Sequence, residues 1–277
     1  MLMVPELIVV ATAFLVLFAD LLVGEGRKNV LAFLAMAGLG LACAFTIWLM
    51  PREGVMLGGR FSVDAVAWWF KLLFLGSAAM TVAISMDTLD GRVAAPAGLG
   101  SRGEYYTILL FTVSGMMFLA SAADLVTLYV SLELATIPLF ILTAWKRDSL
   151  SGEAGLKYVV MGALSSALLI YGLGILYGLT AHTDLVGISR AIEPSPAFWL
   201  AAALITGGVG FKMTMFPFHM WAAEVYQGAP TPITAYISVA SKCAGLLLIF
   251  QLFFRVMGRF MDDWSLMFAV LAAATMT

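Results

Sequence analysis

The sequence predicts an all-α fold, a polytopic transmembrane helix bundle with about nine spans, of which the last is incomplete. Of the 277 residues, 62% are hydrophobic and 12% are charged, about half the charged fraction of a typical soluble domain. The mean hydropathy is +0.99. Apolar runs of the roughly 20 residues needed to cross a bilayer recur along the whole chain. The expected solvent for most of the surface is therefore lipid.

The apolar runs follow one another with short polar connections. The first run lacks a basic flank and a small-residue cleavage site, so it is predicted to be a retained span. The longest connections, 51–61, 87–104 and 181–196, leave no room for a domain outside the membrane. The predicted spans are 4–24, 29–50, 62–86, 105–123, 124–146, 153–180, 197–226, 231–256 and 264–277.

Two of these spans are irregular. Pro217 lies inside the seventh run, where a missing backbone donor predicts a kinked or broken helix. The last run continues for about fourteen residues, or about 21 Å of helix, which is short of a crossing. We therefore expect the chain to be the first portion of a longer protein.

Composition also limits the functions to be considered. The formal net charge is −2, and no clustered Lys and Arg indicate a nucleic-acid surface. Cys43 and Cys243 both lie inside apolar runs and are interpreted as packing residues. Because the sequence has no nucleotide loop, flavin motif or cysteine cluster, no cofactor is expected in this chain.

Three ionisable residues fall near mid-bilayer depth in the spans. Glu133 lies about 14 Å and Lys242 about 16 Å from the starts of their runs, and Lys212 lies shortly before Pro217. Charge at this depth costs several kcal/mol and usually marks function. We expect them to form a row for proton transfer if their helices face one another, although a protonated, hydrogen-bonded Glu133 is the structural alternative. Ser238, four residues before Lys242, is expected to share its face.

Other ionisable residues are less clearly placed. Lys157 lies about one turn inside its span. It is interpreted either as a proton-transfer residue or as a side chain that extends to the membrane interface. His219 follows the expected helix break, where an imidazole either relays protons or donates a structural hydrogen bond. Lys71 lies mid-span without an assigned role. Glu6 and Glu224 lie near span ends and are expected to face headgroups or loops.

Three stretches resemble the antiporter-like subunits of respiratory complex I, most closely subunit N. They are SLELATIPLFIL, GLKYVVMGALSSALLIYGLGILYGLT and GFKMTMFPFHMWAAEVYQGAPTPITAYISVASKCAG. The resemblance covers most of residues 105–277 and, more loosely, 1–104. It implies two inverted five-helix repeats, each with a broken helix. The chain would then consist of an N-terminal three-helix segment (1–104), a first repeat (105–256) and the start of a second repeat (257–277).

The resemblance also implies roles and partners. Glu133 matches the fifth-helix glutamate of the family, Lys157 the sixth-helix lysine, Lys212 the broken-helix lysine and Lys242 the eighth-helix lysine. The implied protein is a proton-translocating subunit of a bacterial inner-membrane NADH:quinone oxidoreductase. Its NADH, flavin, iron–sulfur and quinone sites would lie in other subunits, and a neighbouring antiporter-like subunit and the small K-type subunit would contact it. Alternatives are a subunit of a multi-subunit cation/proton antiporter, a membrane-bound hydrogenase-type complex, or a non-transporting scaffold.

Overall fold

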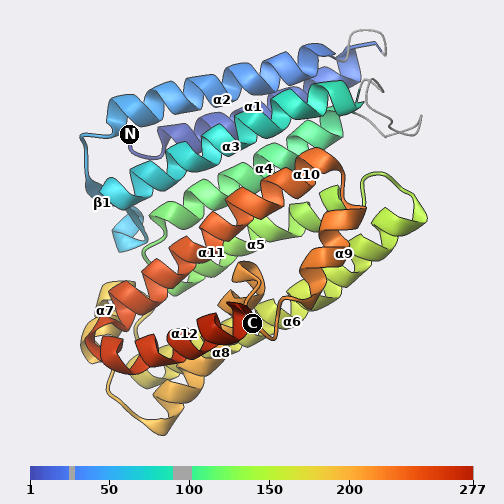
Figure 1. Ribbon diagram of the computed structural model, residues 1–277. Coiled ribbons are helices and arrows are strands. Elements are labelled where there is room, and N and C mark those ends of the chain that lie inside the picture. Colours follow the sequence, from blue (N-terminus) through green and yellow to red (C-terminus); the bar gives the residue numbers. More distant parts are fainter. Residues whose placement is uncertain (25–28, 90–101, 277) are drawn as a thin grey trace.

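The chain folds into a bundle of long helices (Figure 1). The computed structural model describes residues 1–24, 29–89 and 102–276. Within these residues, eight helices are long and apolar enough to cross a membrane, which confirms the all-α polytopic prediction. Most of the expected connection 87–104 lies outside the described residues. Large apolar side chains such as Leu15, Phe33 and Leu156 are exposed, as expected for a surface that faces lipid.

The first four helices form a four-helix unit. They are α1 (Val4–Leu22), α2 (Asn29–Leu49), α3 (Ala65–Leu89) and α4 (Arg102–Ser121). Helices α1 and α3 each pack against α2 and α4, and α2 also contacts α4, so α1 and α3 lie at opposite corners of the unit. Helix α4 is the most buried of the spans and connects this unit to the remaining helices.

The connection between α2 and α3 contains a small β-hairpin that the sequence did not predict. Strands β1 (Gly54–Met56) and β2 (Phe61–Val63) pair antiparallel. The short helix η2 (Leu57–Gly59) turns the chain between them, with positive φ at Leu57, Gly58 and Gly59. A bridge from Phe61 to Ala122 fastens the hairpin to the end of α4.

Helices α5 (Leu125–Thr143) and α6 (Ser149–Thr180) begin at acidic N-cap residues. Asp124 accepts a hydrogen bond from the backbone N–H of Thr127 at 2.5 Å, and Asp148 accepts one from that of Ser151 at 2.7 Å. Such caps satisfy backbone donors that the helix itself leaves free. They fix where both spans start.

The seventh predicted span is two helices. After the short α7 (Leu185–Ala191), α8 runs from Pro196 to Met213 and α9 from Met220 to Gly228. The break lies between them, and the Phe216–Pro217 peptide within it is cis. Proline fits such a break because it lacks the donor that a continuous helix needs.

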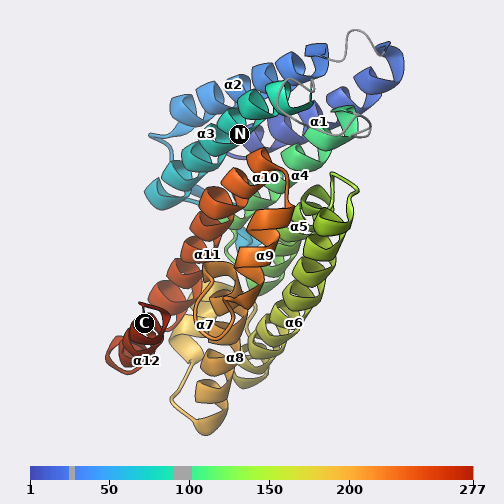
Figure 2. The same cartoon turned by 45° about the vertical axis from the view of Figure 1, so that its right-hand side comes forward.

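The eighth span, Thr231–Val256, changes helical type along its length. It consists of α10 (Thr231–Tyr236), the π-helical η3 (Ile237–Ser241), α11 (Lys242–Ile249) and the π-helical η4 (Phe250–Val256). This span packs against α3, α4, α5 and α8. It is followed by η5 (Gly258–Phe260) and α12 (Met261–Met276), which turns back beside it (Figure 2).

Candidate functional site

Glu133 lies half-buried on α5, on the side that faces α6. Its Oε1 accepts a hydrogen bond from the Ser166 hydroxyl of α6 at 2.6 Å. A hydroxyl donor stabilises the ionised carboxylate without neutralising its charge. Glu133 is therefore held in place by a neutral partner.

Lys212 lies in the last turn of α8, immediately before the helix break, and is 7% exposed. Its ammonium donates a hydrogen bond to the hydroxyl of Thr136, which lies on α5 three residues after Glu133. No ion pair within 4.0 Å joins Lys212 to Glu133, although the two side chains interact electrostatically. Lys212 therefore links α8 to α5 through the hydroxyl of Thr136 instead of through a direct salt bridge with Glu133.

Lys242 approaches the same break from the eighth span. Its ammonium donates to the hydroxyl of Thr214 at 2.9 Å. Thr214 is the C-cap of α8, with φ of 54°, and its own hydroxyl donates to the Met213 carbonyl at 2.7 Å. A β-branched residue in this left-handed region costs roughly 1–3 kcal/mol and occurs where the surrounding structure imposes it.

Ser238, expected on the face of Lys242, bonds its own helix and not the lysine. The Ser238 hydroxyl donates to the Ala235 carbonyl at 2.8 Å. Ser238 lies in the π-helical segment Ile237–Ser241, which directly precedes Lys242.

The helix break is held by aromatic side chains. Trp221 of α9 donates its indole N–H to the Phe211 carbonyl of α8 at 3.2 Å. The same indole stacks on Tyr158 of α6, with ring centroids 4.8 Å apart and planes 11° apart. A broken helix leaves carbonyls without their usual donors, and here the tryptophan supplies one. The aromatic contacts therefore fix α9 against α6 and α8.

Lys157 lies apart from the row. Its side chain is 41% exposed and forms ion pairs with Glu153 at 2.7 Å and with Glu224 at 2.6 Å. Glu224 belongs to α9 and its side chain is 52% exposed. The pair bridges α6 and the segment after the break.

His219 is exposed at the start of α9. Its ring stacks on Phe216, with centroids 5.8 Å apart. In the described part of the chain, no hydrogen bond or ion pair joins it to Lys212 or Lys242. Its expected role in proton transfer stays a prediction.

Sequence reasoning missed the hydroxyl groups that bond the three charged residues of the expected row. Ser166, Thr136 and Thr214 each bond one of its charged members. Thr136 carried a usable signal, because it follows Glu133 by one helical turn on the same face. Thr214 and Ser166 carried none, since their contacts depend on how α8 ends and on how α5 meets α6.

Comparison with known proteins places the chain in a family. Residues 122–277 match the family model described as NADH:quinone oxidoreductase/Mrp antiporter, TM. NADH-quinone oxidoreductase subunit N of Dehalococcoides mccartyi is 37% identical over all of this chain and 58% of its own length. Subunit N of Moorella thermoacetica is 40% identical over 99% of the chain and 57% of its own length. The chain thus spans little more than half the length of these relatives.

Solved structures show the same fold. A chain of respiratory complex I from Thermus thermophilus with bound aureothin matches with a TM-score of 0.76 and 29% identity, over 89% of this chain and 52% of that one. A chain of the Mrp complex from Dietzia matches with a TM-score of 0.73 and 24% identity, over 89% and 28%. The broken helix, the buried lysine before it and these similarities together show that the chain belongs to the NADH:quinone oxidoreductase/Mrp antiporter transmembrane family.

Proposed function

We propose that this chain carries protons in a bacterial inner-membrane NADH:quinone oxidoreductase, within a subunit of the N type. The observation that supports this most is Lys212, a buried cation at the end of a broken helix. Burying an ammonium in the membrane costs free energy, so an intramembrane lysine usually marks function. Broken helices at membrane depth are tolerated where they are packed in protein or line a polar path.

In this proposal, the row works by charge movement between three helices. Glu133 on α5 stabilises the protonated form of Lys212 on α8, with Thr136 between them. If α5 and α8 approached until these two charges were 4 Å apart, the pair would be worth about 4 kcal/mol at an effective dielectric constant near 20. A change in the separation of α5 and α8 therefore switches Lys212 between holding and releasing its proton.

A proton that leaves Lys212 has Lys242 as the next basic group. Lys242 bonds Thr214, two residues beyond Lys212 in the chain, so both lysines meet the same turn of backbone. Both lysines can therefore shift the conformation of this break. Lateral transfer along this row, with Lys157 on the side of α6 and α9 and His219 at the break, is the path we propose.

Redox chemistry is proposed to take place in other subunits. NADH, flavin, iron–sulfur clusters and quinone belong there, and contacts with a neighbouring antiporter-like subunit and the K-type subunit would transmit the coupling. The names of the relatives, which are subunits of NADH-quinone oxidoreductases, support this assignment.

The test is substitution in the intact complex. Glu133→Gln and Lys212→Met are expected to lower the number of protons moved per quinone reduced, because each removes one charge of the row. Glu193→Gln is the matched control, since Glu193 is exposed after α7. Unchanged proton pumping in both row variants, with normal assembly, would remove the proposal.

A cation/proton antiporter subunit is the second candidate, favoured by the family description that includes Mrp antiporters. The same charged row would then exchange ions without redox chemistry. Purification of the full-length protein decides between the two. Quinone oxidoreductase subunits that co-purify support the first, and ion exchange in vesicles that lack such subunits supports the second.

A further inference from the structure

A second buried acid–base pair lies in the four-helix unit, far in sequence from the row. Lys71 Nζ on α3 is 2.7 Å from Glu6 Oε1 on α1, and both side chains are completely buried. Apart from this pairing, their charged atoms have no hydrogen-bond partner in the described part of the chain. The expectation that Glu6 faces headgroups is therefore wrong.

The pair lies between α1 and α3 near one end of the unit, because Glu6 stands in the first turn of α1. Helices α2 and α4 pack against both α1 and α3. Helix α2 contributes no Asp, Glu, Lys, Arg or His. The charged residues of α4, Arg102 and Glu104, stand in its first turn. That turn lies at the other end of α3, where Tyr105 bonds Ser85 at 2.8 Å.

A contact that only held α1 to α3 would be made more cheaply by two apolar side chains. Burying both charges costs free energy that their mutual attraction barely recovers. Full burial adds to this cost, because neither side chain is exposed to solvent. A buried ion pair that costs this much free energy indicates a role beyond packing.

The surroundings of Lys71 stabilise its ammonium even when the Glu6 carboxyl is neutral. Its ammonium lies 4.4 Å from the centroid of the Trp68 ring and 5.2 Å from that of Phe61. Aromatic faces attract cations most strongly where water is excluded. Protonation of Glu6 would therefore leave Lys71 charged and still stabilised.

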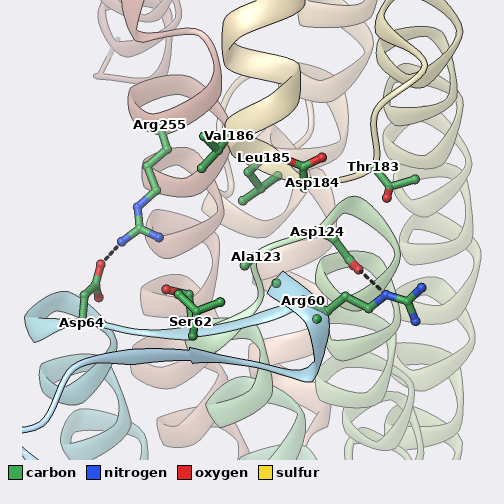
Figure 3. A pocket seen from close by; sticks show the side chains of 13 residues that line it. Arg60, Ser62, Asp64, Ala123, Asp124, Thr183, Asp184, Leu185, Val186 and Arg255 are labelled. Carbon is green, nitrogen blue, oxygen red and sulfur yellow. Dashed lines mark hydrogen bonds and ion pairs between the residues drawn. The ribbon is translucent and has the colours of Figure 1, made fainter.

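A route to water begins at Asp64. This residue directly precedes α3, accepts a hydrogen bond from the Ala67 N–H at 2.8 Å, lies seven positions before Lys71 and interacts electrostatically with that lysine. Asp64 also pairs with Arg255 of η4 and lines an open cavity of about 780 Å³. Figure 3 shows Asp64 paired with Arg255 at one side of this cavity, and the Arg60–Asp124 pair, 3.6 Å apart, at its other side.

We propose that Glu6 and Lys71 form a second proton-exchange site, loaded from this cavity through Asp64. Lys71 passes a proton to Glu6, so that one N–H bond breaks and one O–H bond forms. The neutral Lys71 amine then accepts a proton through the Asp64 carboxylate, which takes it from a hydronium ion in the cavity and returns to its charged form. The loaded state holds one extra proton, as a neutral Glu6 beside a charged Lys71.

Infrared difference spectroscopy of the intact complex after a pH jump tests this proposal. The carbonyl stretch of a dry protonated carboxyl should appear with loading and be lost in Glu6→Gln. Glu104→Gln, at an exposed residue of α4, should retain it. In Lys71→Met the difference band should be lost while the carboxyl band stays in the absolute spectrum, because an unpaired buried carboxyl remains protonated at every pH. Asp64→Asn should slow loading by roughly tenfold or more.

A double variant guards against failure to assemble. Glu6→Gln with Lys71→Met leaves no uncompensated charge, so it should assemble normally and lack the band. A wild-type complex without any pH-dependent band, or a band that survives in the double variant, overturns the proposal. The readout does not involve proton pumping, so it is independent of whether Glu133 and Lys212 carry protons.

Discussion

Gly115 provides a test of how tightly α4 holds the helix that carries Glu133. A Cβ atom at this position would lie 2.7 Å from the Leu134 carbonyl carbon and 2.9 Å from the Ala135 Cα of α5. Ordinary contacts begin at 3.4 Å. The two helices must therefore separate by at least about 0.7 Å, the difference between these distances, to accept Gly115→Ala. Overpacking of this kind costs about 1–3 kcal/mol.

Gly40→Ala is the matched control, because a Cβ at Gly40 of α2 meets nothing within 4 Å. Both substitutions gain the same helix propensity, about 1 kcal/mol, so it cancels in the comparison. At about 2–4 °C per kcal/mol, the thermal unfolding midpoint of the Gly115 variant should lie roughly 2–12 °C below that of the control. Equal midpoints for the two purified variants would refute the close approach of α4 and α5.

Three further predictions concern single residues. The backbone N–H groups at the start of α6 hold the pKa of Asp148 below its ordinary value of 3.8. A depressed pKa adds stability above the unfolded-state value and loses it as pH falls through the folded-state value. The thermal midpoint should therefore drop below pH 3.8, and Asp148→Asn, which caps without titrating, should flatten this dependence. Thr214→Gly removes the acceptor of Lys242 but suits the positive φ. Proton transport should fall roughly tenfold, whereas Thr214→Asn should retain it, and equal transport in both contradicts the contact. Glu224→Gln breaks an exposed ion pair with Lys157, so the free energy of unfolding should change by no more than about 1 kcal/mol. A larger loss of this free energy in a denaturant titration would contradict the prediction.

The spans were predictable because each obeys a local rule. A run such as 29–50 must be apolar to cross lipid and must be helical to satisfy its backbone. The structure places α2 at Asn29–Leu49, within one residue of this expectation. The seventh span broke as expected from Pro217, although α8 already ends at Met213.

The contacts between spans were not predictable from local rules. Depth along a helix placed Glu133, Lys212 and Lys242 at one level, but it does not say which way each side chain points. Lys242 bonds Thr214 at the end of α8, whereas Ser238 bonds the Ala235 carbonyl of its own helix. The π-helical segment before Lys242 was also not predicted, because no local rule in the sequence indicates one.

The sequence by itself determined that this chain lies in a membrane, how many times it crosses, and which charges the crossing buries, since each follows from the free energy of transferring residues into lipid. Only the tertiary structure decided which buried charges meet. Lys71 bonds Glu6 from a helix 65 positions away in sequence, and Lys212 reaches a threonine instead of Glu133. Pairing depends on helix rotation and on close approaches such as that at Gly115, which arise from the packing of the whole bundle.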